Sequence, residues 1–382
     1  MTYLLRLLFY PCACILAALL FTACSSSKDL RRVPSPLPEI TPTLGVAQIW
    51  KASVGKGNRY LFQPLAFDDV VYAAGANGVV AKFAAHSGEM LWSTKLDAEL
   101  SAGVGGDGAV VAVASLNGTV HVLDAHGKLL WQAQARGEIL TPPLVGQGKV
   151  FVRTTDSRII AFDLATGAQK WVFYNRAPLL SLRTSAGMTF AGTGALLAGF
   201  ADGSLAVLNL ANGLAYWQTP VAYASGVTEV ERLNDVTGAP TLVDYQTCAV
   251  TFQGRLSCFN VQNGQPLWER PFSSYRGIAQ DKTALVASDD ASVVSLYDAA
   301  DGKLLWQNTK LKNRSLGTPI LTGQAIVVGD YRGFVHFLSR EQGALVARME
   351  TDHSAISAQP VLVKHTLIVQ TRNGNLYAFR SK

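Results

Sequence analysis

A unit of about 42 residues recurs eight times along the 382-residue chain, and it constrains the fold more than any other feature. The stretch 117–131 is typical of the unit. Its residues 119–123 alternate as in a β-strand, residues 124–127 have turn chemistry, and a second strand begins at Leu129. The turn ahead of the first of these strands recurs at positions 78, 118, 157, 203, 254, 292, 333 and 374.

Every tryptophan of the chain falls at one place in the repeat, in the strand that follows its second turn. These residues are Trp50, Trp92, Trp131, Trp171, Trp217, Trp268 and Trp306. The seventh copy has Ala347 at this place, and the eighth reaches the C-terminus before it, so the segment around Trp50 supplies the missing strand. We therefore predict an all-β fold, an eight-bladed β-propeller of four-stranded blades, closed by the N-terminal strand. Each Trp is expected to wedge between neighbouring blades.

The N-terminus predicts export and lipid attachment. A short basic start precedes an apolar run, residues 7–20, which is too short to span a membrane. The run ends in Leu-Phe-Thr-Ala-Cys24, which resembles the lipobox of bacterial lipoproteins, where the cysteine is acylated. An ordinary secretory signal with an incidental cysteine is the alternative.

Three segments follow from this interpretation. Residues 1–23 are predicted to be a lipoprotein signal peptide, residues 24–44 a lipid-anchored tether rich in Ser and Pro, and residues 45–382 the propeller. Ser25, rather than Asp, follows Cys24, which resembles the pattern that is sorted to the outer membrane. We therefore expect the protein to be anchored by lipid at the periplasmic face of the outer membrane.

Charge and cysteine content narrow the remaining function classes. The formal net charge is +6, only 16% of residues are charged, and no basic stripe interleaved with aromatic residues suggests nucleic-acid binding. Within the propeller, Cys248 and Cys258 flank the turn at Gln253. A two-residue turn would place Cys248 opposite Phe259, one step out of register, so a disulfide would need a bulge or a wider turn. The pattern leaves the disulfide undecided.

No spacing of His, Cys, Asp or Glu is typical of a metal site or an activated nucleophile, so we expect no catalytic residue, metal or cofactor. The stretch 161–171 resembles the repeat of pyrroloquinoline-quinone (PQQ) propellers. Enzymes of that family also carry adjacent cysteines, a calcium-binding set and a catalytic Asp, for which we find no equivalent here. A PQQ-type oxidoreductase or a ligand-binding periplasmic propeller remains the alternative, since a shared fold does not imply a shared function.

Two consecutive connections between blades are longer than the others. The intervals from Trp171 to Gly203 and from Trp217 to Gly254 are 32 and 37 residues, whereas the other five lie between 24 and 27. Such connections share one rim of a propeller, so we expect the two loops to be neighbours. Long loops on a rigid scaffold are often functional. Leucines and arginines in the first loop, and Arg232 among acids in the second, favour a protein interface.

The chain from Cys24 to its end resembles the BamB family, the propeller lipoproteins of the outer-membrane β-barrel assembly machinery. This resemblance implies a non-enzymatic scaffold that binds the central assembly subunit, BamA, through its periplasmic domains and assists nascent outer-membrane proteins. The Leu-x-Leu-Arg motif of the family falls on Leu180, Leu182 and Arg183. Its Asp-x-Asp motif falls on Asp235 and Thr237, so the second acid is absent.

Overall fold

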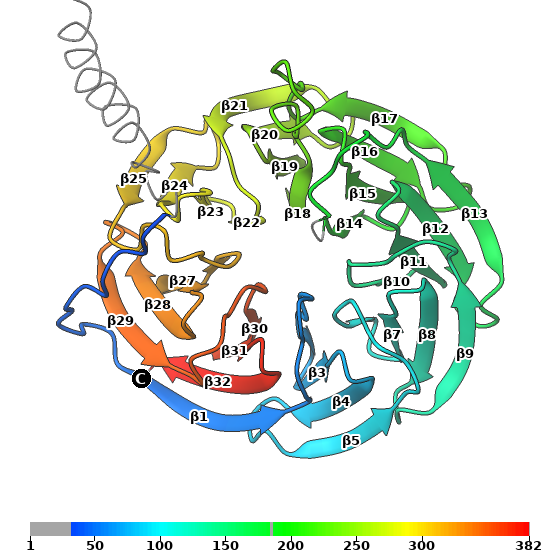
Figure 1. Cartoon of the computed structure of the whole chain (residues 1–382), viewed down its shortest axis with the longest axis horizontal. Coiled ribbons are helices and arrows are strands. Elements are labelled where there is room, and N and C mark those ends of the chain that lie inside the picture. Colours follow the sequence, from blue (N-terminus) through cyan, green and yellow to red (C-terminus); the bar gives the residue numbers. More distant parts are fainter. Residues whose placement is uncertain (1–31, 184–185, 382) are drawn as a thin grey trace, which may run out of the picture. The chain divides into compact units, whose positions relative to one another are not determined.

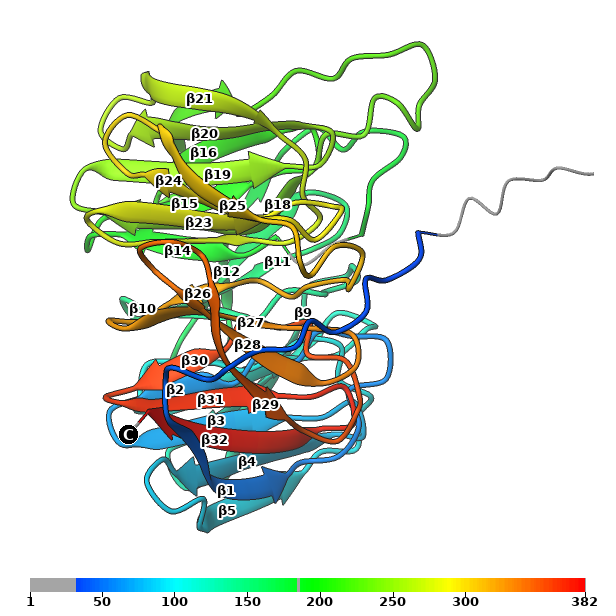
Figure 2. The same cartoon turned by 90° about the vertical axis from the view of Figure 1, so that its left-hand side faces the viewer.

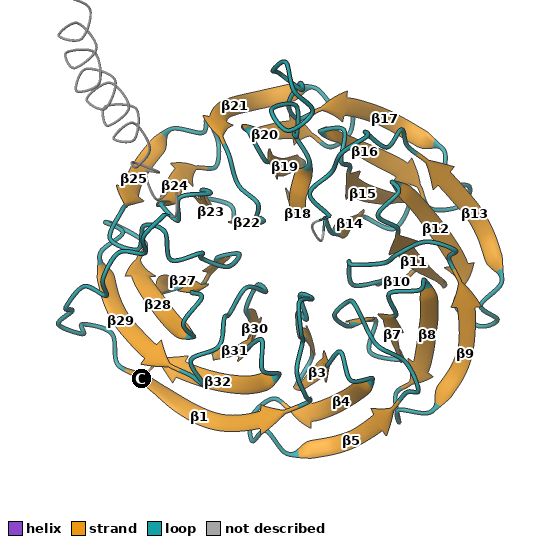
Figure 3. Ribbon diagram, viewed as in Figure 1, coloured by secondary structure: helices purple, strands orange, loops and turns teal. Residues whose placement is uncertain are grey.

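The computed structural model describes residues 32–183 and 186–381. Residues 35–381 form a ring of eight antiparallel sheets, each with four strands (Figures 1 and 2). Figure 3 shows only strands and loops in this part of the chain, and no helix there could cross a membrane. The eight-bladed all-β propeller predicted from the repeat is confirmed.

The first four blades each run from an inner strand at the central channel to an outer strand at the edge. Blade 1 contains β2 (Leu65–Phe67), β3 (Val70–Ala74), β4 (Val79–Ala84) and β5 (Met90–Lys95). Blade 2 contains β6 (Gly105–Gly106), β7 (Val110–Ala114), β8 (Thr119–Asp124) and β9 (Leu129–Gln134). Blade 3 contains β10 (Leu144–Gly146), β11 (Lys149–Arg153), β12 (Arg158–Asp163) and β13 (Gln169–Tyr174). Blade 4 contains β14 (Met188–Ala191), β15 (Ala195–Gly199), β16 (Ser204–Asn209) and β17 (Ala215–Pro220).

The other blades repeat this plan, except that the last one takes its outer strand from the start of the chain. Blade 5 contains β18 (Val236–Val243), β19 (Gln246–Thr251), β20 (Gly254–Asn260) and β21 (Pro266–Phe272). Blade 6 contains β22 (Ile278–Gln280), β23 (Ala284–Ser288), β24 (Val294–Asp298) and β25 (Leu304–Asn308). Blade 7 contains β26 (Ile320–Leu321), β27 (Ala325–Gly329), β28 (Phe334–Ser339) and β29 (Leu345–Glu350). Blade 8 contains β30 (Val361–Val363), β31 (Thr366–Gln370), β32 (Asn375–Ser381) and β1 (Val46–Ser53).

Strand β1 closes the ring, as predicted. It pairs antiparallel with β32, with Trp50 opposite Ala378 and Ser53 opposite Asn375. The pairing shifts by one residue between Gln48 and Trp50. Backbone hydrogen bonds between β1 and β32 thereby join the two ends of the propeller and complete blade 8.

Each tryptophan joins its blade to the next through one hydrogen bond and one packing contact. The indole N–H donates to a backbone carbonyl in the last turn of the following blade, at N···O distances of 2.8–3.1 Å. The same turn presents a glycine to the indole face. In blade 1 this is Gly88, whose φ is +72° and whose Cβ, if present, would lie 2.6 Å from Trp50 Cδ2. The indole therefore fits against this turn only because the residue there has no side chain.

The junction between blades 7 and 8 explains the alanine in the seventh copy. The third and fourth strands of blade 8 come from opposite ends of the chain, so no turn connects them. An indole at Ala347 would find neither a turn glycine nor a turn carbonyl there. Ala347 is buried, and a cavity of about 380 Å³ between these blades is lined by residues that include Phe337, Phe379 and Leu44.

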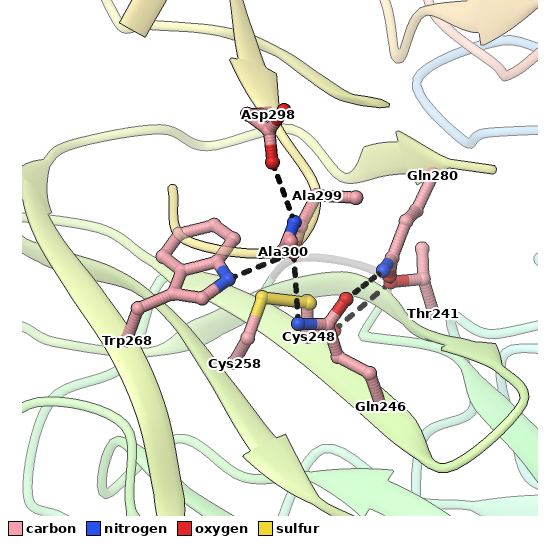
Figure 4. Close-up of a disulfide and its surroundings, with 9 residues drawn as sticks. All are labelled: Thr241, Gln246, Cys248, Cys258, Trp268, Gln280, Asp298, Ala299 and Ala300. Carbon is pink, nitrogen blue, oxygen red and sulfur yellow. Dashed lines mark hydrogen bonds between the residues drawn. A yellow bond between two sulfur atoms is a disulfide. The ribbon is translucent and has the colours of Figure 1, made fainter. Parts of the chain in front are cut away.

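Cys248 and Cys258 form a disulfide between β19 and β20 (Figure 4). They are directly opposed in the sheet, with Cα atoms 4.1 Å apart. The register expected from a two-residue turn is wrong because the loop is wider, with residues 251–255 between the last opposed pair, Val250 and Leu256. Beside the disulfide, the Gln246 side chain donates to Ala299 O at 2.9 Å, the same carbonyl that accepts from the indole of Trp268.

Residues 35–44, within the segment predicted to be a tether, lie along blades 6 and 7. We call them the strap. At one end, Ser35 N donates to Lys312 O and Ser35 O accepts from the Arg314 side chain, both at 2.9 Å. Further along, Pro38 O accepts from Arg348 at 2.7 Å, and Thr43 N donates to Val346 O at 2.9 Å. The strap therefore leads to β1 along a defined path.

Candidate protein interface

The two long connections lie on the same rim of the ring (Figure 2). The first connection, residues 175–187, joins blade 3 to blade 4, and the second, residues 221–235, joins blade 4 to blade 5. A hydrogen bond of 3.0 Å from Leu182 N to Asp235 Oδ1 links them directly. The structure thus places the two connections side by side, as the shared rim predicts.

The first connection exposes apolar side chains to solvent. Leu179 is 92% exposed and Leu180 is 42% exposed, whereas Leu182 is half-buried. Arg183 is exposed and forms an ion pair with Glu138. Leu179 therefore does not pack the loop onto the blades, and Leu180 does so only in part.

The second connection is folded around an acid, with apolar residues pointing outward. The Glu231 carboxylate accepts hydrogen bonds from Thr228 N and Val227 N, both at 2.9 Å, and these bonds hold its pKa below the usual value. Val227 is 95% exposed and Val230 is 59% exposed. Arg232 is exposed beside them. These hydrogen bonds to Glu231 fix the backbone of the loop, and Val227 and Val230 are exposed on it.

Sequence reasoning missed the apolar part of the second connection. It singled out the charged residues there, although Val227 and Val230 stand out as the branched aliphatic residues of a polar loop. It also missed Tyr174, which precedes the first connection, and Tyr223, which lies in the second; they are 71% and 81% exposed. Tyrosine and aliphatic residues on a polar rim are typical of protein interfaces.

Asp235 lies in the interior, at 4% exposure. Burial raises the pKa of its carboxyl, although the hydrogen bond from Leu182 N opposes that rise. The other carboxylate oxygen, Oδ2, has no hydrogen-bond partner among the described residues. The buried guanidinium of Arg153 lies close enough to interact with it electrostatically, and burial lowers the pKa of Arg153 to about 10. Asp235 therefore positions the first connection through Leu182 N.

Thr237, where the family motif has its second acid, is buried in a set of hydrogen bonds between blades. Its hydroxyl lies 3.0 Å from Ser274 O and 2.9 Å from Arg276 O, both in the connection to blade 6. The Thr141 hydroxyl makes a similar bond of 3.2 Å to Ala186 O. A hydroxyl at position 237 therefore helps to fix the rim.

No group of three or more His, Cys, Asp and Glu side chains among residues 32–183 and 186–381 is arranged to hold a metal ion. Cys24 lies outside the described residues.

Comparisons with known proteins give a consistent result. The family model described as "Outer membrane protein assembly factor BamB" matches residues 76–308 and 289–382. A protein of that name from Burkholderia pseudomallei is 60% identical over 372 residues, which cover 97% of this chain and 98% of the relative. The crystal structure of BamB from Moraxella catarrhalis superposes with a TM-score of 0.82 at 27% identity, covering 88% of this chain and 99% of that chain.

The quinohemoprotein alcohol dehydrogenase from Comamonas testosteroni has a similar fold. Its TM-score is 0.70 at 13% identity, covering 89% of this chain and 77% of that chain. At this identity the likeness concerns the propeller fold alone.

Proposed function

The chain belongs to the family of the outer membrane protein assembly factor BamB, and from this premise we propose that it is a scaffold subunit of the outer-membrane β-barrel assembly complex. In this role it binds the central BamA-type subunit and assists the folding and insertion of β-barrel proteins. The work is mechanical, because a rigid ring holds a partner in one orientation.

The observation that carries this proposal is the pair of linked connections. Leu179 and Leu180 are exposed in one connection, Val227 and Val230 in the other, and the hydrogen bond from Leu182 N to Asp235 holds the two connections together. Exposed apolar residues on ordered loops suit a protein partner. Arg183 and Arg232 add charged groups at the edge of this surface.

We also propose that Cys24 carries the lipid anchor and that the protein resides at the periplasmic face of the outer membrane. The lipobox-like sequence before Cys24 and the Ser- and Pro-rich segment after it support this assignment. The names of the relatives, which are outer membrane assembly factors, support the location.

Co-purification of the partner from outer membranes tests the interface. We expect that changing Leu179, Leu180, Val227 and Val230 together to alanine abolishes partner retention without lowering the melting temperature, since all four side chains are exposed to solvent. Truncating a central anchor of an interface costs about 2 kcal/mol or more. Arg183→Glu should weaken retention more than Arg183→Ala, because it reverses a charge that faces the partner.

The control variant is Leu304→Ala, Leu305→Ala, which removes two exposed leucines, at 44% and 49% exposure, from the outer strand β25. It should retain the partner in full. Full retention by the loop variant, or loss of the partner together with unfolding, would contradict the assignment. Titration with PQQ and calcium separates a scaffold from an oxidoreductase, because the enzyme should bind both.

A further inference from the structure

A cavity of about 330 Å³ opens beside the long connections and is rich in arginine. Among the residues that the structure describes, its lining includes Arg59, Arg183, Arg276 and Arg372 and contains no Asp or Glu. Three of these arginines belong to connections between blades, and Arg372 belongs to the turn between β31 and β32. Both kinds of segment lie on the rim that carries the candidate interface. We call this cavity the arginine mouth.

Two of these arginines contact aromatic rings. The Arg59 guanidinium lies 5.3 Å from the ring centre of Tyr60, and that of Arg276 lies 5.1 Å from the ring centre of Tyr275. Arg276 Nε also donates to Leu316 O at 3.4 Å. Stacking on a ring orients a guanidinium and leaves its remaining N–H groups free to donate.

Few acids balance these charges. Arg183 pairs with Glu138, which, together with Glu99, also interacts with Arg59 over a longer range. For the Arg372 side chain, no hydrogen bond or ion pair occurs within the described residues. Burial lowers the pKa of Arg276, and the neighbouring charge of Arg372 lowers it further. The positive charges in this cavity repel one another, so binding of an anion there is favourable.

The Arg372 backbone is fixed although its side chain is exposed. Arg372 N donates to Ala355 O at 2.8 Å, and Arg372 O accepts from Gly57 N at 2.8 Å, which ties three segments of the rim together. A cation carried on such a backbone loses little freedom when it binds an anion, because only its side chain has to become ordered. The mouth is therefore organised before any ligand arrives.

Below the mouth, the hollow continues into a second cavity of about 240 Å³, which is lined by both apolar and polar residues. Its lining includes Pro142, Pro143, Leu144 and Met188, and it shares Gly238, Gly277 and Thr318 with the mouth. A ligand that places negative charge at the arginines could extend a neighbouring side chain against Leu144 and Met188. The two volumes have room for a few side chains of a peptide.

We propose that the arginine mouth receives the carboxylates of an acidic peptide segment of the protein partner. The inference rests on the proposed function, since Arg183 belongs both to the mouth and to the connection that carries Leu179 and Leu180. A partner seated on those leucines would have the mouth directly beside it. The forked N–H groups of arginine match the two oxygens of a carboxylate.

Fluorescence anisotropy tests the proposal directly. The probe is a labelled peptide in which Asp and Glu alternate with Leu, compared with the same peptide carrying Asn and Gln. We expect the soluble propeller to bind the acidic probe, more weakly as salt rises, and to ignore the amide probe. Arg276→Gln, Arg372→Gln should weaken binding about tenfold or more, since both remove charges from a concave site.

A matched control removes two positive charges from the opposite rim, where Lys128 and Lys303 lie in the last turns of blades 2 and 6. Lys128→Gln, Lys303→Gln should bind the acidic probe like the wild type. Because Arg276 is largely buried, Arg59→Gln, Arg372→Glu, which changes only exposed side chains, gives the same test without risk to the fold. Absence of acidic-probe binding by the wild-type propeller, equal binding of the acidic and amide probes, or equal losses in the mouth and control variants, would overturn the proposal.

Two further arms separate the possible failures. If anionic phospholipid vesicles bind the propeller through the arginines and the acidic peptide does not bind, the mouth binds lipid phosphate and the proposal is wrong. If the peptide fails to bind but the Leu179 and Leu180 changes still release the partner, the scaffold function stands and only the mouth is wrongly assigned. If the peptide binds and those changes release nothing, the interface on the loops is wrong and the mouth stands.

Discussion

The contact between Trp50 and Gly88 closes the ring between blades 8 and 1, and its strength can be measured. Gly88→Ala places a methyl group 2.6 Å from Trp50 Cδ2 in a backbone with φ of +72°. The left-handed backbone costs a side chain about 1–2 kcal/mol. Displacing the buried indole adds about 1–3 kcal/mol. We expect a total loss of about 2–5 kcal/mol in the free energy of unfolding.

Gly148→Ala is the matched control. Gly148 has φ of +71° in the turn between β10 and β11, but nothing lies within 4 Å of the position that its Cβ would take. This variant should therefore lose only the backbone part, about 1–2 kcal/mol. Urea unfolding of the soluble propeller, followed by circular dichroism, measures both variants against the wild type. Equal losses of unfolding free energy for Gly88→Ala and Gly148→Ala would show that contact with Trp50 is not the reason for a glycine at position 88.

A double-mutant cycle isolates the contact itself. Trp50→Ala removes a buried indole and its hydrogen bond to Ala85 O, a loss of about 3–5 kcal/mol. In Trp50→Ala, Gly88→Ala, the added methyl group meets no indole, so the combined loss should fall short of the sum by about 1–3 kcal/mol. An additive result would show that the methyl group and the indole do not meet.

Four further outcomes are expected. Cys24→Ala should release a folded protein from the outer-membrane fraction, as cell fractionation will show. Deleting residues 46–53 removes β1 and should lower the melting temperature, because the whole ring loses its closure. Asp235→Ala should weaken partner retention by freeing Leu182 N, whereas Asp235→Asn keeps an acceptor and should retain the partner. Burial keeps the pKa of His336 below its usual value, so the unfolded chain takes up the proton first. Stability should therefore fall as the pH drops through about 6.5, with a smaller slope in His336→Gln.

The repeat carried most of the fold in advance because each copy contains the same local signals. Turn residues and a tryptophan at a fixed place determine four strands per blade, and the position of Trp50 requires closure by the N-terminal strand. Ala347 is visible in the sequence as an exception to the tryptophan pattern, but the reason for it lies in the assembled ring. Only there does the eighth blade prove to have two chain ends where the others have a turn.

Side-chain burial at the interface was harder to predict than loop position. Loop lengths measured along the chain place the two connections on one rim, since all such connections share it. They do not reveal that Asp235 faces inward, because its role depends on a backbone N–H of Leu182, 53 residues earlier. The predicted register of Cys248 and Cys258 was wrong for a similar reason. One additional residue in a turn shifts every pair in the hairpin, and the turn residues alone left its width open.

The arginine mouth was not visible as a motif because its members are far apart in sequence and belong to different blades. Arg59, Arg276 and Arg372 each look like an isolated surface charge. They converge because a propeller gathers every connection between blades around one opening. Aligning the repeats by their turns would have assigned all three to the same rim, which is the signal that a sequence search could use.

The strap connects this rim to the proposed anchor. Ser35 is bound to Lys312 and Arg314 in the connection between blades 6 and 7, and this connection belongs to the rim that carries the long loops and the arginine mouth. A fully extended chain spans at most about 3.6 Å per residue, so residues 24–34 reach about 40 Å. Acylation of Cys24 would therefore keep Ser35, at this rim, within about that distance of the membrane surface. A short tether raises the effective concentration of the rim for a membrane-embedded partner, so the interface can remain modest in area and still be occupied.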